Sequence, residues 1–342
     1  MKKICCILFL MMLQHNLSIS QTTPVNRQEF FLNDNLIEVN FTTDIKKIRN
    51  DKKVPAYQPA TISMKFSDSL TITEQIRVQP RGVYRKQYCD MASLMLNFKN
   101  PSSPKLSPLK KLKFVGGCKV GSTYEELLLK EFLVYKIQSF LSPLSFRVRL
   151  LNVTYNDSKG KVKPFRQYAF LLEDMEDLTA RNNCVEIKPK NFFTEATNRE
   201  QMTFVNLFQY MIGNTDWSIP NLHNMKLMVS KSDTLARPYA VPYDYDYCGL
   251  VNADYAVPAE GLQIENVSQR VYRGFPRGLN ELETAIEVFK EKKERILYYV
   301  EHFELCTAKC RKTMISYLNE FYETINNKKK VQSLFIANAR TE

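Results

Sequence analysis

Hydrophobic residues follow two different periodicities in the two halves of this chain, and that change constrains the fold most. In the first half, apolar and polar residues alternate, as at Ile62, Met64 and Phe66, which is the pattern of strands with one buried face. A sparser alternation near residues 36–41 predicts an entry strand within an otherwise irregular arm. Further strands are predicted over residues 61–66, 70–80, 94–99, 112–115, 146–155 and 167–172.

One long helix interrupts these strands, and helices dominate the second half. Residues 123–141 predict this helix, since Thr123 can cap its start and Pro143 stops it. Helical patterns return over residues 199–212 and, with a break near Cys306, over residues 280–327. Between them lie a polar loop and a hairpin, predicted over residues 213–224, 225–229 and 239–242. The order of elements predicts an α+β fold, and 342 residues suffice for two packed units.

The N-terminus has the features of a signal peptide. Lys2 and Lys3 precede a short apolar run over residues 4–13, and Ser18 and Ser20 suit a cleavage site before Gln21. No later segment approaches the ~20 apolar residues that a membrane helix needs. The predicted mature protein is exported, to the periplasm or beyond, and has no transmembrane segment after cleavage.

The predicted export affects the interpretation of the cysteines. Six of the eight lie beyond residue 20, and an oxidising compartment permits disulfides among them. Six cysteines allow 15 pairings, and the sequence does not choose between them. Cys306 and Cys310 are one helical turn apart, so they are either two buried thiols on one helix face or a bonded pair.

The chain is basic, with 48 Lys and Arg against 36 Asp and Glu and a formal charge of +12. These charges are scattered rather than gathered on a recognition helix or an aromatic RNA-binding motif. A solvated basic face explains the excess, and export argues further against a nucleic-acid partner.

The most informative stretch extends from Thr215 to Asp246. Asp216 lies on the loop after the second helix, with Asn221 five residues later and Asn224 three further on. The hairpin follows, and Asp244 stands at its exit. Phosphoryl transfer needs such residues: one carboxylate orients the attacking hydroxyl, while an amide oxygen and a second carboxylate hold Mg²⁺ against the phosphates.

This combination resembles the spore coat protein H (CotH) kinase-like family, in an exported form found in Bacteroidetes. That family has an Asp, then a His-Asn pair, then a Pro-aromatic-Asp-x-Asp segment, matched here by Asp216, His223-Asn224 and a segment ending at Asp246. The resemblance implies an atypical protein-kinase fold with a strand-rich N-lobe and a mainly helical C-lobe. It makes Asp216 the catalytic base, Asn224 and Asp244 ligands of Mg²⁺, and ATP the donor. Asp246 is a candidate for a second metal or for backbone hydrogen bonds.

The first half resembles the family less closely. Arg81-Gly82 matches an Arg-Gly segment, but the family's following Asn and Lys-Lys-Pro run are absent. A kinase-like lobe needs a strand lysine facing the phosphates and a helix glutamate to hold it. Lys113 and Glu131 are the preferred pair, and Lys99 competes with Lys113. Residues 170–174, which include Glu173, occupy the expected hinge where backbone groups meet adenine.

These observations predict an exported kinase-like phosphotransferase that moves a phosphoryl group from ATP to a hydroxyl of a secreted protein. Its segments are a signal peptide (1–20), an arm (21–60), a nucleotide-binding N-lobe (61–173) and a C-lobe (174–335). Two alternatives remain open. The chain is a catalytically inactive kinase-like protein that binds a nucleotide or other ligand, or a non-enzymatic surface protein that binds glycan or protein through its basic face.

Overall fold

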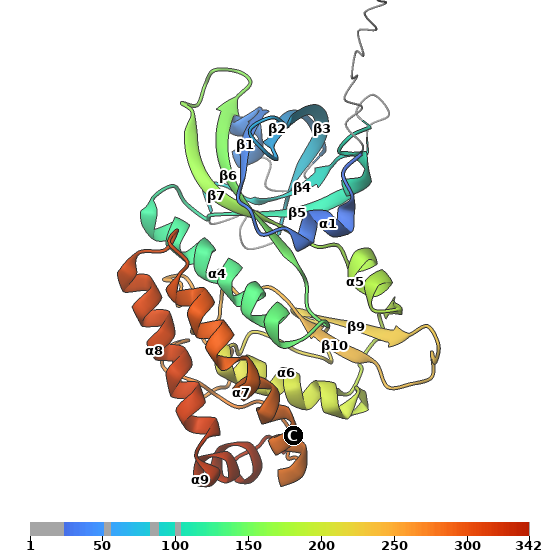
Figure 1. The fold of residues 1–342 in the computed structure, drawn as a ribbon, viewed down its shortest axis with the longest axis vertical. Helices are drawn as coiled ribbons and strands as arrows, with labels where there is room; N and C mark the ends of the chain where they lie inside the picture. Colours follow the sequence, from blue (N-terminus) through green and yellow to red (C-terminus); the bar gives the residue numbers. More distant parts are fainter. Residues whose placement is uncertain (1–23, 51–55, 83–88, 100–103, 342) are drawn as a thin grey trace, which may run out of the picture.

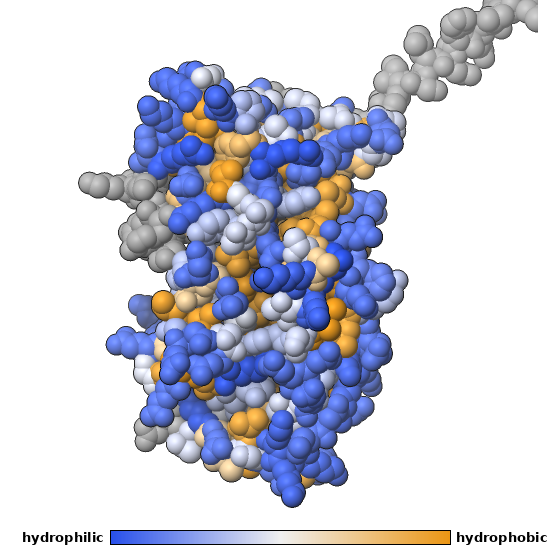
Figure 2. Space-filling model, turned by 90° about the vertical axis from the view of Figure 1, so that its left-hand side faces the viewer, coloured by the Kyte–Doolittle hydropathy of each residue, from blue (hydrophilic) through white to orange (hydrophobic). Residues whose placement is uncertain are grey.

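The computed structural model describes residues 24–50, 56–82, 89–99 and 104–341. The predicted signal peptide therefore lies outside the described residues. Within them, no helix is both long and apolar enough to cross a membrane. On the face shown in Figure 2, hydrophilic residues cover most of the surface, and hydrophobic residues gather in patches between them.

Seven strands close into a mixed β-barrel at one end of the molecule (Figure 1). Around the barrel their order is β1-β2-β3-β4-β5-β7-β6; β1 and β6 pair in parallel, and all other neighbours pair antiparallel. Their bounds are β1 (Ile37–Thr43), β2 (Gln58–Lys65), β3 (Thr71–Arg81), β4 (Ser93–Asn97), β5 (Lys111–Gly116), β6 (Val148–Asp157) and β7 (Phe165–Leu172). All the strands predicted in the first half are present, and the predicted entry strand is β1, a full member of the barrel.

The rest of the described chain contains helices, a small sheet of order β10-β9-β8 and irregular segments, of which residues 243–278 are the longest. The strands of this sheet are β8 (Cys184–Ile187), β9 (Met225–Ser230) and β10 (Tyr239–Pro242). The helices are α1 (Arg27–Leu32), α2 (Ile45–Asn50), α4 (Ser122–Leu141), α5 (Met175–Arg181), α6 (Arg199–Ile212), α7 (Leu279–Glu301), α8 (Ala308–Ile325) and α9 (Lys328–Gln332). The prediction of an α+β protein is confirmed, and so are the β9–β10 hairpin and the break between α7 and α8.

Helix α4 joins the barrel to the helical part. In Figure 1 it passes beneath the barrel, and it contacts β6 and β7 on one side and α7 on the other. Because both sides are covered, even its polar residues Glu131, Lys136 and Gln138 are buried. Helix α4 is therefore a central helix, covered on both sides.

Helix α6 leads directly into the predicted polar loop. The side chain of Asn198 accepts a hydrogen bond from the backbone N–H of Gln201 and caps its start. Gly213 ends the helix with φ +65°, and a Cβ there would lie 2.0 Å from the Tyr317 hydroxyl, so only glycine fits.

One disulfide joins two loops of the barrel. Cys89, before β4, bonds Cys118, between β5 and α4. Cys184, Cys248, Cys306 and Cys310 are free and buried, and thus the interpretation of Cys306 and Cys310 as two buried thiols is the one that the structure supports.

Candidate functional site

A cavity of about 420 Å³ lies where the barrel meets the loops around β9 and β10. Arg81, Gly82, Ser93 and Val115 line it from the barrel, while the loops contribute Asp216, His223, Asn224, Asp244, Asp246 and Tyr247. The three candidates Asp216, Asn224 and Asp244 therefore line one cavity, together with Asp246 and with Arg81 from the distant strand β3. This convergence is what a site for phosphoryl transfer requires.

Asp216 stands in a dense set of hydrogen bonds. One carboxylate oxygen, Oδ1, lies 2.8 Å from Nε2 of His223, and Oδ2 accepts a hydrogen bond of 2.9 Å from Nδ2 of Asn224. The same Asn224 nitrogen donates to the Asp216 carbonyl at 2.9 Å. With its nitrogen used in this way, Asn224 has its amide oxygen left to accept a cation. Asn221, the alternative ligand, is exposed and does not line the cavity.

Asn224 and Asp244 share an unusual backbone conformation. Their φ angles are +51° and +67°, in the left-handed region where Asn and Asp are tolerated better than other side chains. Two contacts hold them: the Tyr243 N–H donates to the Asn224 carbonyl at 3.1 Å, and the Asp244 N–H donates to the hydroxyl of Tyr135 at 2.9 Å. Such conformations gather at functional sites, where the surrounding structure imposes them.

Three carboxylates form an acidic cluster beside the cavity. Oxygen atoms of Glu131, Asp244 and Asp246 lie within 4.8 Å of one another, and Glu131 is only 2% exposed. The Tyr255 hydroxyl donates to Oδ2 of Asp246 at 3.2 Å. Like charges at this spacing repel unless a cation or a proton compensates them, and oxygen ligands of this kind are those that Mg²⁺ prefers. The residues present therefore fit a divalent cation.

Lys113 lies on β5, the strand before α4, as predicted. Its ammonium lies 4.9 Å from the ring centre of Tyr243, and burial, with the nearby charges of Arg81 and Lys226, lowers its pKa to about 8. Asp244 and Asp174 act in the opposite direction. Glu131, on the central helix α4, lies with Asp244 and Asp246 in the acidic cluster, and its pairing with Lys113 stays a prediction.

Two other predicted nucleotide contacts lie away from the cavity. Lys99 is exposed just beyond the end of β4. Glu173 is buried and forms an ion pair of 2.9 Å with Arg181, while its Oε2 accepts a hydrogen bond of 3.0 Å from the Arg147 N–H. At the expected hinge, Leu171 and Leu172 pair with β5 on one side and β6 on the other, so their backbone groups are engaged within the sheet. Glu173 thus stabilises the connection between β7 and α5.

Tyr135 is a contributor that the sequence analysis missed. It lies on α4, is 1% exposed, and both accepts the Asp244 N–H and packs against the ring of Tyr245 at 4.7 Å. Tyr245 in turn donates to the side chain of Gln138, also on α4, at 2.7 Å. A separation of 109 residues between Tyr135 and Asp244 gives no local signal, so only the packing of α4 under the barrel reveals this support.

In chemical terms, the cavity has a cluster of oxygen ligands suited to a cation, and beside it a carboxylate suited to act as a base. No protein-family model matches the chain, and no curated protein matches it significantly either.

Proposed function

We propose that the protein is an exported, kinase-like phosphotransferase that uses ATP and Mg²⁺ to phosphorylate a hydroxyl of a secreted protein. The observation that supports this most is the presence of Asp216, Asn224 and Asp244 around one cavity, with Arg81 opposite them. A kinase-like arrangement of two lobes, with the nucleotide between the barrel and the β9–β10 loops, is part of the proposal.

Each residue has a role that follows from its position. Asp216 is 32% exposed in its side chain and is the base that orients the acceptor hydroxyl. Asn224, Asp244 and Asp246, joined by Glu131, hold Mg²⁺, which when bound neutralises charge on the phosphates. Arg81 has a guanidinium suited to grip a phosphate, and the Lys113 ammonium adds positive charge nearby.

Export is part of the same proposal. The N-terminal segment has the features of a signal peptide, and the bond between Cys89 and Cys118 agrees with an oxidising compartment. An exported protein is therefore the proposed acceptor, with no nucleic acid as partner.

The catalytically inactive alternative is favoured by one observation. Kinases hold their phosphate-binding lysine with a helix glutamate, whereas Glu131 here lies with two aspartates. An inactive relative would still bind a nucleotide in this cavity but would not transfer its phosphate.

Nucleotide binding and transfer are tested together. We expect MgATP to raise the unfolding temperature of the wild-type protein, and ATP without Mg²⁺ to raise it much less, because the acidic cluster needs the cation. Labelled γ-phosphate should appear on proteins exported by the same cell. Asp244→Asn should abolish both effects and remain folded, since Asn tolerates the same backbone conformation.

The matched control is Asp233→Asn, which removes an exposed carboxylate in the β9–β10 turn. It should behave as the wild type. Binding without transfer would support the inactive alternative, and the absence of any Mg²⁺-dependent nucleotide binding would rule out both kinase-like interpretations.

A further inference from the structure

Asp216 lies in the turn Thr215–Trp217, and side chains donate hydrogen bonds to all three backbone carbonyls of this turn. Nη1 of Arg273 donates to the carbonyl of Thr215, with a short contact, and to that of Trp217 at 3.0 Å. The carbonyl between them, that of Asp216 itself, accepts from Asn224. Arg273 therefore holds the backbone on both sides of Asp216, while Asn224 holds the carbonyl between them.

The guanidinium group of Arg273 makes two further interactions with the turn, one with an aromatic ring and one with a carboxylate. The guanidinium carbon lies 5.1 Å from the ring centre of Trp217, and the arginine is half-buried. Electrostatic attraction also links it to the Asp216 carboxylate. A planar, always charged group that donates several hydrogen bonds while covering an aromatic ring is a combination that arginine provides and lysine does not.

The backbone that bears Arg273 is anchored on both sides. Before it, Arg270 lies with its guanidinium 3.5 Å from the ring centre of Tyr317 and pairs with Glu320 at 2.8 Å. After it, the buried Arg277 pairs with Glu195 at 2.7 Å.

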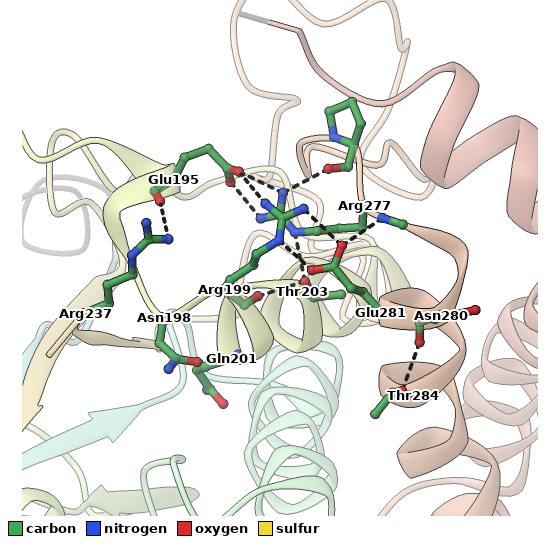
Figure 3. A network of polar contacts seen from close by, with 12 residues as sticks. Glu195, Asn198, Arg199, Gln201, Thr203, Arg237, Arg277, Asn280, Glu281 and Thr284 are labelled. Carbon is green, nitrogen blue, oxygen red and sulfur yellow. Dashed lines mark hydrogen bonds and ion pairs between the residues drawn. The ribbon is translucent and has the colours of Figure 1, made fainter.

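Figure 3 shows how the second anchor continues into the helices. Nε of Arg277 donates to the hydroxyl of Thr203 on α6 at 2.9 Å. Arg199, also on α6, pairs with Glu195 at 3.3 Å and with Glu281 on α7. The guanidinium of Arg273 is therefore presented to the turn from a backbone that α6, α7 and α8 hold in place.

We infer that Arg273 is a positioning residue for Asp216: it fixes the Thr215–Trp217 turn so that the Asp216 carboxylate points into the cavity. Its importance for phosphoryl transfer rests on the proposed function, but its effect on the turn does not. Among the residues that the structure describes, Arg273 does not line the cavity, and its hydrogen bonds go to the carbonyls of Thr215 and Trp217, so Mg²⁺ and nucleotide binding should depend on it little.

Trp217 makes the inference directly measurable, because it is the only tryptophan of the chain and is 4% exposed. In Arg273→Gln we expect acrylamide to quench Trp217 fluorescence at least about twofold more strongly than in the wild type, as the turn loosens. Transfer of the γ-phosphate of ATP should fall by about 10- to 100-fold, the size of effect that misplacing a reacting group by an ångström produces. The affinity for MgADP should stay within about threefold, since its ligands are elsewhere.

Arg273→Lys and Arg270→Gln complete the design. Arg273→Lys keeps the charge and one or more donors, so its quenching and transfer should lie between those of the wild type and Arg273→Gln; it also serves if Arg273→Gln does not fold. Arg270→Gln removes a neighbouring arginine that does not contact the turn; because Arg277 still anchors the segment, quenching should stay near the wild-type value.

Three results would overturn the inference: unchanged quenching in both Arg273 variants, equal quenching in Arg270→Gln, or a loss of transfer matched by an equal loss of MgADP affinity. If the wild type transfers no phosphate, the proposed function fails, while the quenching series still decides whether Arg273 positions the turn.

Discussion

At the scale of single residues, Asp244 combines a demanding backbone conformation with close like charges. Its φ of +67° costs most residues about 1–2 kcal/mol, and its carboxylate lies near those of Glu131 and Asp246. Removing the charge while keeping the tolerance for this conformation should therefore stabilise the protein. Stability that is given up at a site in this way is common where function needs it.

In urea unfolding without divalent cations, Asp244→Asn should raise the free energy of unfolding by about 0.5–2 kcal/mol, the usual range for relieving such a conflict. Asp244→Ala should be about 1 kcal/mol less stable than Asp244→Asn, because alanine tolerates the left-handed region poorly. Adding Mg²⁺ should stabilise only the wild type. A less stable Asp244→Asn in the absence of cation would mean that the acidic cluster is compensated within the protein itself.

If the protein binds a nucleotide as proposed, Lys113 should make the affinity depend on pH in a defined direction. Burial and two neighbouring cations lower its pKa to about 8, so the ammonium is charged below that pH and neutral above it. MgADP affinity should fall about five- to tenfold between pH 7 and pH 9, because the charged fraction of Lys113 falls from about nine-tenths to about one-tenth over this range. Lys113→Met should bind more weakly at pH 7 and lose this pH dependence, as isothermal titration calorimetry can measure; a wild-type affinity that is flat over this range would contradict the assignment.

The lowered pKa of Lys113 also affects folding, but here a higher pH is favourable. Between pH 8 and the ordinary lysine value of 10.5, the unfolded chain binds the proton that folded Lys113 has released. The contribution of Lys113 to the free energy of unfolding therefore rises with pH across this window and is least favourable below it.

The residues of the site that the sequence predicts best are those that lie close together in the sequence. Asp216 and Asn224 share one loop, and Asp244 follows the short hairpin, so their types and spacing are informative without a structure. The position of Glu131 beside Asp244 and Asp246 was not predictable from the sequence, because it depends on which face of α4 is turned toward these residues.

At the scale of elements, the Cys89–Cys118 bond ties the loop before β4 to the loop that begins α4. The backbone N–H groups of Asp90 and Met91 also donate to the Cys118 carbonyl. In the sequence, Cys89 lies between Arg81, the last residue of β3, and Ser93, the first residue of β4. Arg81 and Ser93 both line the cavity.

Replacing both cysteines by serine should cost about 2–4 kcal/mol of stability, as for other natural disulfides. It should also weaken MgADP binding several-fold, because the barrel wall of the cavity becomes less constrained. Before any reduction, the unfolded mature wild type should contain four titratable thiols, those of Cys184, Cys248, Cys306 and Cys310. A double variant with wild-type nucleotide affinity would separate the disulfide from the site.

Elements were predictable when they were long or strongly patterned. Helix α6 has the predicted bounds, whereas β8, with four residues, and α5, with seven, were missed. Strand β8 exists because Val185 and its neighbours pair with β9, which is a tertiary interaction and leaves little pattern in so short a segment.

At the scale of the whole molecule, two hydrophobic clusters meet at the barrel strands below which α4 lies. Phe114 of β5 and Leu171 of β7 belong to the cluster of the barrel. Their neighbours Val115 and Phe170 point the other way and belong to the cluster of the helices. Because successive residues of a strand face opposite sides, the same two strands belong to both cores.

This sharing predicts that the protein unfolds as one unit. The Phe170 side chain is fully buried against Phe132 and Tyr135 of α4, with ring centres 6.3 and 5.5 Å apart, and Phe170→Ala should cost about 3–5 kcal/mol. Trp217 fluorescence, which reports the cavity loop, and far-UV circular dichroism, which reports all elements, should give one midpoint in urea. That midpoint should fall by the same amount in both signals.

Phe193→Ala is the matched control, since this phenylalanine is 78% exposed and its loss should change stability by less than about 0.5 kcal/mol. If the two signals separate in the wild type or in Phe170→Ala, the barrel and the helices fold independently. The cavity between them would then be assembled from two domains that move relative to each other, and its walls would have to be brought together by the ligand. Coincident midpoints mean instead that Arg81 and Asp216 are held opposite each other before any nucleotide binds.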